Sequence, residues 1–379
     1  MTAPPTHDRL NFLQSLVCPI TKSPLTHTTA IEAERLIGQR LCARSPVPNA
    51  RGALSRAVGV TTDVLLREDL ECAYPVVDGY PILLSPEALY PEGESHVVDL
   101  TEPMHAEAYE EMDVYNDLAS QEATQIRQSE AFSTIRPILD HPSRDKLEFP
   151  EPSNVWLDAV YDSAGQLDAY RHLAPVRGMR VLQLGGKGIH AVKLLLAGAS
   201  NASLVTPMLG EARCATALAN AAGVADRLHC IIAVAERLPL AENVVDRLYT
   251  GGCLHHMTTA LAFAEANRVL TPGGRFAAVD PWKAPLYSIG IRIFGKREKN
   301  VYCVPLDSMR IAPAAVAFRD VKVIHHGAIT RYPLLVLQKL GLTTSLRAAL
   351  AITKADDAIS DLVPALRQQG SSVVVLGSK

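Results

Sequence analysis

Several features that mark other protein classes are missing from this 379-residue sequence. It has no run of roughly 18 consecutive apolar residues, the length that spans a bilayer, and residues 1–16 lack a basic segment followed by a long apolar run. Its seven cysteines include no close pair, which disfavours a disulfide framework and a zinc-ribbon spacing. We therefore expect a cytoplasmic protein with reduced thiols and no membrane partner.

Aromatic residues are also scarce, at 5% of the chain. The densest basic run, residues 296–299, has no interleaved aromatic series that could stack nucleic-acid bases, so we do not expect a nucleic-acid partner. The net charge of −3 is uneven: residues 93–152 hold 4 basic and 14 acidic residues, whereas residues 153–379 hold 25 and 16. Either the acidic segment docks on the basic half, or the basic half faces an acidic ligand.

The length and composition favour more than one folded unit. At 48% hydrophobic and 20% charged residues the chain is an ordinary globular protein, and 379 residues exceed what one core usually serves. We predict an accessory domain over residues 1–92, an acidic helical linker or lid over 93–152, and a larger domain over 153–379. Residues 104–118 and 126–139 show helical periodicity in the middle segment, which is either a lid or a solvated spacer.

In the larger domain, short apolar strands alternate with helical stretches, which is typical of a parallel sheet covered on both faces. This predicts an α/β, Rossmann-like fold with seven strands. Helices are expected at residues 190–197, 211–222 and 259–269. The expected strands are Arg180–Leu184, Ser203–Thr206, Leu228–Ala233, Asp246–Tyr249, Arg275–Val279, Lys322–His325 and Ser372–Leu376.

A Gly-rich turn follows the first of these strands. Gly185, Gly186 and Gly188 lie between the buried strand and a helix, with Lys187 among them. Glycine lets the backbone approach a ligand closely, and a helix N-terminus offers unpaired amides to a carboxylate. Nucleotide-binding folds share this motif, so it does not by itself define a ligand.

The motifs that follow the Gly-rich turn narrow the choice among the folds that share it. Ala235-Glu236-Arg237-Leu238-Pro239 precedes the fourth strand, Leu254-His255-His256 follows it, and the stretch from Arg268 to Phe276 contains Thr-Pro-Gly-Gly. Over residues 165–280 this series resembles the class I S-adenosylmethionine-dependent methyltransferases, in the small-molecule branch that includes ubiquinone-biosynthesis methylases. The resemblance implies S-adenosylmethionine as cofactor and a small-molecule acceptor that is methylated on oxygen, nitrogen or carbon.

The resemblance also implies cofactor-binding positions, and several of them depart from the family pattern. In that family an acid ends the second strand and holds the ribose, and another acid after the third strand reaches the adenine. Here the expected cofactor-binding residues are Gln183, Gly185, Gly186, Gly188, Thr206, Ala235 and Glu236. Each lost carboxylate removes charge-assisted hydrogen bonds worth roughly 1.5–3 kcal/mol. Three functions therefore stay open: methyl transfer, another reaction on the same fold, and a non-catalytic activator or binding protein.

Two groups of residues are candidates for acceptor chemistry. His255 and His256 follow the fourth strand, where a parallel sheet places its ligand crevice, and an imidazole there could act as a general base. Asp280, Tyr287 and Tyr302 fall in or near a stretch that resembles the variable insertion shaping the acceptor pocket. No metal is expected, because no Cys or carboxylate spacing accompanies the histidines. A homo-oligomer is possible.

The Gly-rich turn also gives two expectations for substitutions. Gly185→Val is expected to abolish cofactor binding with only a modest loss of stability, because the turn lies at the edge of the sheet. Lys187→Ala is expected to weaken binding less, because its ammonium is taken to be solvated.

The N-terminal region contains two punctuated extended segments, residues 16–25 and 74–84. They resemble the signatures of the small zinc-ribbon-derived activator domain of methyltransferases that modify tRNA and translation factors. In such a domain zinc needs four thiolate or imidazole ligands. Only Cys18 stands at a ligand position, with Thr21 at its partner position and Cys72 two residues late. We therefore expect an α+β accessory domain without zinc, in which both cysteines are buried apolar side chains.

Overall fold

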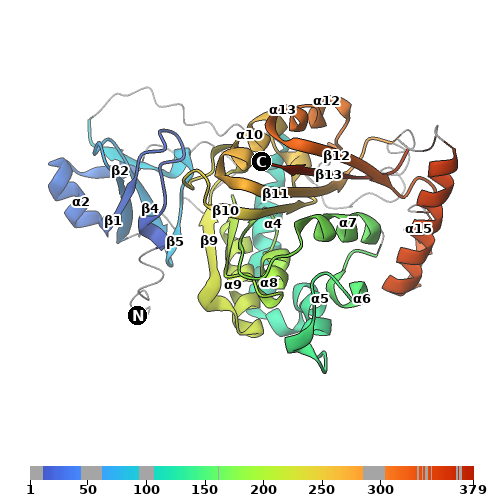
Figure 1. Cartoon of the computed structure of the whole chain (residues 1–379). Helices are drawn as coiled ribbons and strands as arrows, with labels where there is room; N and C mark the ends of the chain where they lie inside the picture. The colour runs from blue at the N-terminus through green and yellow to red at the C-terminus, as the bar shows by residue number, and fades with distance from the viewer. Residues whose placement is uncertain are drawn as a thin grey trace.

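The computed structural model describes residues 12–43, 62–93, 106–160, 162–284 and 304–379, apart from positions 331–332, 335, 338–339, 343, 364–365 and 367–368. It contains two sheets, which Figure 1 shows side by side with the N-terminal sheet in blue.

The larger sheet has seven strands in the order β12-β13-β11-β10-β7-β8-β9. Strands β7 to β11 run parallel, β13 is antiparallel to both of its neighbours, and all seven expected strands are confirmed. The strands are β7 (Arg180–Leu184), β8 (Asn201–Thr206), β9 (Leu228–Ile232), β10 (Val245–Gly251), β11 (Leu270–Pro281), β12 (Arg319–His326) and β13 (Ser372–Ser378). The predicted Rossmann-like α/β class is therefore confirmed.

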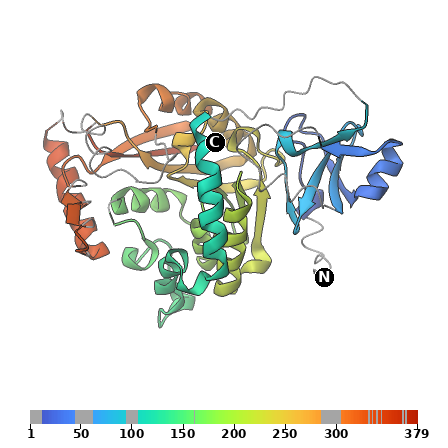
Figure 2. The ribbon, with the colours of Figure 1, turned by 180° about the vertical axis from the view of Figure 1, so that it is seen from behind.

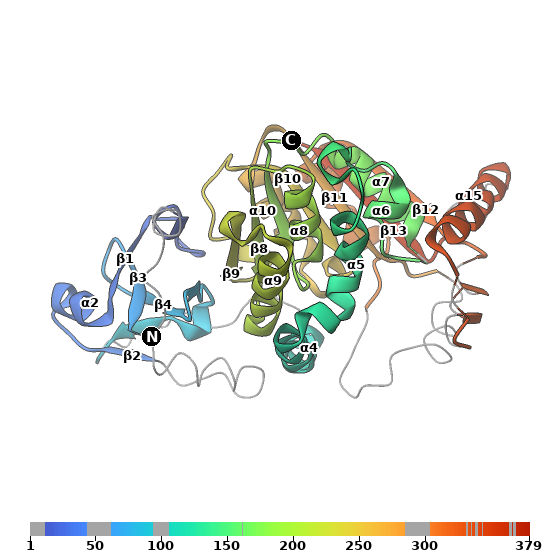
Figure 3. The ribbon, with the colours of Figure 1, turned by 90° about the horizontal axis from the view of Figure 1, so that it is seen from below.

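Helices cover both faces of this sheet, as Figures 1 and 3 show. One face packs against helices whose apolar residues form one hydrophobic cluster with Val181, Tyr249 and Val279, and the other packs against a cluster that contains Phe263 and Phe276. On the first face lie α5 (Glu130–Leu139), α6 (Ser153–Trp156), α7 (Ser163–Leu173), α8 (Ile189–Leu196) and α9 (Leu209–Ala222). On the second lie α10 (Thr259–Val269), α12 (Ser308–Ile311) and α13 (Ala314–Ala317). A final helix, α15 (Leu346–Leu362), packs against α7 and β12.

The Thr-Pro-Gly-Gly segment lies within strand β11 (Leu270–Pro281). Strand β11 already begins at Leu270, which pairs with Val245, and the pairing then shifts so that Arg247 faces Arg275. Residues 271–274 form the irregularity between these two registers, and Gly273 supplies a φ of +76°. The turn is therefore built into the start of the strand and does not precede it.

The described part of the acidic middle segment from residue 106 to residue 152 packs against the larger domain and is not a solvated spacer. Its long helix α4 (Ala106–Thr124) runs along α9, which Figure 2 shows from behind. The Asn116 side-chain oxygen accepts the Gly210 amide at 2.8 Å, and Glu122 pairs with Lys187. Farther along, Glu151 pairs with Arg171 at 2.7 Å. These contacts agree with docking of the acidic segment on the basic half of the chain.

The N-terminal sheet joins β9, the edge strand of the larger sheet. Ile82 forms a parallel bridge with Ile232, and the Leu83 amide donates to the Ile232 carbonyl at 2.7 Å. Lys22 pairs with Glu265 at 2.7 Å. The strands are β1 (Leu25–Thr29), β2 (Leu41–Ala43), β3 (Asp63–Arg67), β4 (Ala73–Val77), β5 (Tyr80–Pro81) and β6 (Leu89–Pro91), with helix α2 (Ala30–Ile37). The predicted α+β character of this region is confirmed, whereas the three domain boundaries stay predictions.

None of the helices in the described part of the chain combines the length and the apolar content needed to cross a membrane.

Candidate functional site

The strand order reverses between β7 and β10, and open parallel sheets bind their ligands at such a point. From β7 the chain builds outward through β8 to β9, then crosses back to begin β10 on the other side of β7. At such a switch point the loops after two adjacent parallel strands diverge, which opens a crevice at their carboxyl ends. The Gly-rich turn after β7 and the loop after β10 both lie at this point.

Gln183 holds the Gly-rich turn together. Its side-chain nitrogen donates to the Gly185 carbonyl at 2.7 Å, and its side-chain oxygen accepts the Ala191 amide of α8 at 2.7 Å. A carboxylate could not make both bonds, because it can only accept hydrogen bonds. Gln183 therefore has a structural role that a carboxylate could not fill, and a direct cofactor contact of this side chain stays a prediction.

The glycines of the turn adopt left-handed backbone conformations, which other residues rarely adopt. Gly185, Gly186 and Gly188 all have φ between +70° and +75°. A Cβ on Gly188 would lie 2.4 Å from Ala215, whereas a Cβ on Gly186 would meet only the Gln183 side chain, at 3.4 Å. Gly188 is thus needed for helix packing, and Gly186 leaves its backbone open to a ligand.

The expectation for the stability of Gly185→Val is corrected by the position of this glycine. A Cβ on Gly185 would lie 2.6 Å from the Cys253 sulfur and 2.8 Å from the Cys253 Cβ. The turn lies between two central strands, so a larger side chain must push the loop after β10 away. We therefore expect a substantial loss of stability, not a modest one.

The expectation of a solvated Lys187 is also wrong. Its ammonium pairs with Glu122 of α4, and the side chains are 31% and 13% exposed. Burial acts to lower the pKa of Lys187, but the contact with Glu122 outweighs it and raises the pKa. Lys187 therefore fastens α4 to the Gly-rich turn.

Glu211 is a buried acid that sequence reasoning missed. The Thr206 hydroxyl at the end of β8 donates to Glu211 Oε2 at 2.5 Å. Burial raises the pKa of Glu211 to about 7, opposed by the Thr206 hydroxyl and by Lys187. This acid lies beside the strand end where the family carries its own. Its position in the first turn of a helix, where carboxylates are favoured, was the signal available in the sequence.

Ala235 and Glu236 follow β9 in the short helix η5 (Ala235–Arg237), and both are buried. Glu236 Oε1 accepts the Thr258 amide at 2.7 Å, just before α10. Glu236 therefore joins two loops at the carboxyl edge of the sheet. The predicted cofactor contacts of both residues stay predictions.

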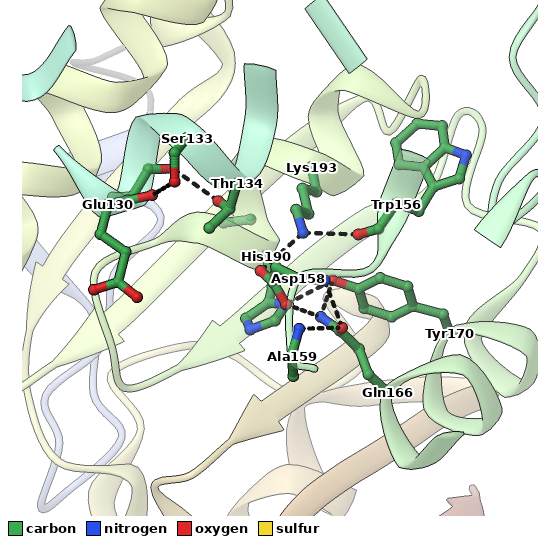
Figure 4. A network of polar contacts seen from close by, with 12 residues as sticks. Glu130, Ser133, Thr134, Trp156, Asp158, Ala159, Gln166, Tyr170, His190 and Lys193 are labelled. Atoms are coloured by element: carbon green, nitrogen blue, oxygen red, sulfur yellow. Dashed lines mark hydrogen bonds and ion pairs between the residues drawn. The ribbon is translucent and has the colours of Figure 1, made fainter. Parts of the chain in front are cut away.

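A buried polar network, drawn in Figure 4, lies beside the Gly-rich turn and was not expected. Lys193 of α8 is fully buried and donates to Asp158 Oδ2 at 2.8 Å and to the Trp156 carbonyl at 2.7 Å. Burial acts to raise the pKa of Asp158, but Lys193 outweighs it and lowers the pKa to about 2. Gln166 then links Asp158, at 2.6 Å, to the Tyr170 hydroxyl, at 3.2 Å.

The network ends at His190, in the first turn of α8. The Tyr170 hydroxyl lies 2.6 Å from His190 Nδ1, and the His190 ring lies 4.3 Å from the Tyr249 ring of β10. Removal from water lowers the pKa of His190 to about 4, so the ring is neutral at pH 7. A chain of side chains thus fixes the start of α8 next to the crevice.

The predicted catalytic and acceptor residues fall partly together. His255 Nδ1 lies 2.8 Å from Asp280 Oδ1, and the His255 and His256 rings are 3.9 Å apart. Tyr287 and Tyr302 lie outside the described residues. The structure therefore brings together His255, His256 and Asp280 from the predicted set, and their roles stay predictions.

In the N-terminal region the Cys18 sulfur accepts the Thr21 amide at 3.5 Å and lies 3.4 Å from the Tyr74 hydroxyl. Cys18 and Cys72 are both buried, and burial raises the pKa of Cys72 to about 12. Among the described residues, no group of three or more His, Cys, Asp or Glu side chains could hold a metal ion.

The sequence of this crevice region matches a known family. Residues 182–278, from β7 into β11, match the family described as a methyltransferase domain. A curated relative, the ubiquinone/menaquinone biosynthesis C-methyltransferase UbiE of Cereibacter sphaeroides, is 29% identical in an alignment of 185 residues that covers 44% of this chain and 69% of the relative.

Solved structures of similar proteins are more distant. The geranyl diphosphate C-methyltransferase of Streptomyces coelicolor A3(2), in complex with Mg²⁺, geranyl diphosphate and S-adenosyl-L-homocysteine, is 15% identical with a TM-score of 0.46, over 73% of this chain and 99% of that chain. The [4+2]-cyclase SpnF is 20% identical with a TM-score of 0.39, over 57% of this chain and 82% of that chain.

Proposed function

We propose that this protein transfers a methyl group from S-adenosylmethionine to a small-molecule acceptor. The observation that carries the proposal is the Gly-rich turn, which lies at the switch point of the sheet and inside the residues that match the methyltransferase domain. The curated relative is named as a C-methyltransferase of quinone biosynthesis, which supports a small molecule as the acceptor class.

The residues of the crevice fit this cofactor. The N-terminus of α8, whose preceding Gly188 is left-handed, offers backbone amides to the carboxylate of the methionine portion. The open backbone at Gly186 allows close approach. Glu211, next to Thr206 at the end of β8, supplies the carboxylate for the ribose hydroxyls that position 206 lacks. When bound, the cofactor supplies an electrophilic methyl group, and the chain contributes mainly orientation and exclusion of water.

The accessory region at the N-terminus has a supporting role in this proposal. Its backbone bonds to β9 and its ion pair from Lys22 to Glu265 hold it against the loop that contains Ala235 and Glu236. Leu83 and Ala88 share a hydrophobic cluster with Ala235. We infer that this activator-like region stabilises the adenine end of the crevice within the same chain.

Calorimetry with S-adenosylmethionine and S-adenosylhomocysteine tests the proposal directly. Both should bind, and Gly186→Ala should weaken binding about tenfold or more, because a methyl group then stands where the backbone faces the ligand. Gly223→Ala is the matched control: its φ is +73°, no atom lies within 4 Å of the added Cβ, and it ends α9 away from the crevice. No heat from either ligand at millimolar concentration would exclude the proposed function.

A further inference from the structure

His255 and Asp280 form a buried pair at the carboxyl edge of two neighbouring parallel strands. His255 lies in η6 (Leu254–His256) after β10, and Asp280 lies near the end of β11. Asp280 Oδ1 accepts the His255 backbone amide at 3.0 Å and lies 2.8 Å from His255 Nδ1. His255 is 7% exposed and Asp280 is 2% exposed. One carboxylate oxygen therefore holds both the backbone and the ring of the same histidine.

The contacts fix the ring in one tautomer and orientation. An ionised Asp280 can only accept, so the proton of a neutral His255 is assigned to Nδ1, and Nε2 is the basic nitrogen. The segment itself is held from the other side, because Arg310 Nη2 donates to the carbonyls of His255 and Met257 at 2.9 and 3.0 Å. This is the arrangement of an oriented general base.

A second observation points to a ligand at this edge. Asp280 Oδ2 is buried without a hydrogen-bond partner among the described residues, and the same holds for Thr250 Oγ1. Thr250 lies in β10, and Asp280 lies farther along the neighbouring strand β11. Buried polar atoms are rarely left unpaired, because each costs about 1–3 kcal/mol. Hydrogen-bonding groups of a bound acceptor would satisfy these atoms.

We propose that His255 is a catalytic base, that Asp280 is its positioning residue, and that the methyl group is accepted by an ionisable hydroxyl such as a phenol or an enol. This proposal rests on the proposed methyltransferase function. It reassigns Asp280 from an expected substrate-binding residue to one that acts through His255.

The step balances within the site. His255 Nε2 removes the hydroxyl proton while the oxygen lone pair forms a bond to the methyl carbon. The bond between that carbon and sulfur breaks, and its electrons stay on sulfur, which gives neutral S-adenosylhomocysteine. The imidazolium is stabilised by Asp280 and returns its proton to water.

The strength of the base favours oxygen as the acceptor atom. An imidazole is suited to a phenol-like hydroxyl that loses its proton as the new bond forms. An amine that is neutral at the site needs no base before attack, because its own lone pair is the nucleophile. Most carbon acids are far weaker than a phenol and need a stronger base than imidazole.

The first test identifies the methylated atom without knowing the acceptor. The full-length protein is incubated with S-adenosylmethionine labelled with ¹³C at the methyl group and with a small-molecule cell extract. The ¹³C chemical shift of the product distinguishes methyl on oxygen, nitrogen and carbon, and we expect oxygen. Methyl on carbon or nitrogen overturns this proposal while the methyltransferase function stands. No transfer, with cofactor binding intact, overturns both.

The second test measures the role of the pair with the same extract and label. His255→Asn should lower the transfer rate about 10²- to 10⁴-fold, and Asp280→Asn should lower it and shift the acid limb of the rate–pH profile. His229→Phe, at the start of β9 away from the crevice, is the control and should keep the rate. A purely structural role would leave the shape of the pH profile unchanged, and an unchanged profile in Asp280→Asn overturns the assignment.

Discussion

The two sides of the crevice differ in whether their polar groups have partners within the chain. On the side of β7 and β8, the Thr206 hydroxyl is bonded to Glu211, Gln183 uses both of its polar ends, and Lys187 is paired with Glu122. On the side of β10 and β11, Thr250 Oγ1 and Asp280 Oδ2 have no hydrogen-bond partner among the described residues. These polar groups of the first side are paired within the chain, without a ligand. The second contains atoms that a ligand would satisfy.

This difference matches what each side is proposed to bind. A cofactor that stays the same in every turnover is best held by a rigid, preorganised turn, and internal hydrogen bonds supply that rigidity. An acceptor site must release its product, and atoms that are paired only in the complex contribute to binding without a competing internal bond. Substitutions on the two sides should therefore have different effects on stability.

The largest effect is expected at Lys193, in the network beside the Gly-rich turn. Lys193→Met leaves Asp158 buried without its cation, which should lower the free energy of unfolding by about 3–5 kcal/mol. Arg213→Met is the matched control, because the 2.5 Å ion pair between Arg213 and Asp78 is exposed and should contribute at most about 1 kcal/mol. Urea denaturation measures both. Equal losses of unfolding free energy in the two variants would show that burial does not make the Lys193 ion pair more important for stability than an exposed one.

The next largest effect is expected at Gly185. Gly185→Val combines a left-handed backbone with a clash against Cys253, and should lower the free energy of unfolding by about 3 kcal/mol. Gly252→Val, with a φ of +65° and no atom within 4 Å of its added Cβ, isolates the backbone cost in the neighbouring loop. Thermal unfolding should rank Gly185→Val as the less stable variant. The opposite order would contradict the packing of Cys253 on the turn.

Glu211 should make stability depend on pH. Its pKa is raised by burial from an ordinary 4.5 to about 7, so the folded state holds the proton more tightly than the unfolded state. Its contribution is therefore present at low pH and is lost as pH rises from about 4.5 to 7, a change of roughly 2 kcal/mol between pH 5 and pH 8. Glu211→Gln should remove this loss and also weaken binding of S-adenosylmethionine. Identical pH profiles of unfolding for the two proteins would contradict the buried carboxyl.

The smallest effects give the sharpest comparison of the two sides. Thr206→Val removes the hydroxyl that bonds Glu211 and accepts the Met208 amide, and should cost about 1–2 kcal/mol. Thr250→Val removes a buried hydroxyl with no described partner, and should be neutral or slightly stabilising. The same substitution is thus made once on each side. Equal losses, measured by urea denaturation, would remove the distinction between them.

The strands and the crevice were predictable from the sequence because they depend on local patterns. The apolar run from Val181 to Leu184, followed by glycines, predicts a strand and a turn, and the alternation of strands and helices predicts their parallel order. The ion pair of Lys187 was not predictable in this way, because its partner Glu122 lies 65 residues earlier in the chain. Nothing in the local pattern around Lys187 indicates that α4 returns to this point.

Buried charge was the other feature that the sequence did not reveal. Lys193 lies in an apolar helix, and its partner Asp158 comes from a loop between α6 and α7, so only the folded chain brings them together. The pair of His255 and Asp280 was predictable only in part. Both residues were candidates because they follow neighbouring parallel strands, but their direct contact depends on the turn of the chain after β10.

The bridge between Ile82 and Ile232 has a further consequence for solubility. Strand β9 is the last strand of the larger sheet, and an uncovered edge strand offers its unpaired amides and carbonyls to other chains. In this protein the Leu83 amide donates a hydrogen bond to the Ile232 carbonyl, and apolar residues of the N-terminal region cover the same strand. The N-terminal region therefore protects β9 against edge-to-edge aggregation, a hazard that the larger sheet would face without it.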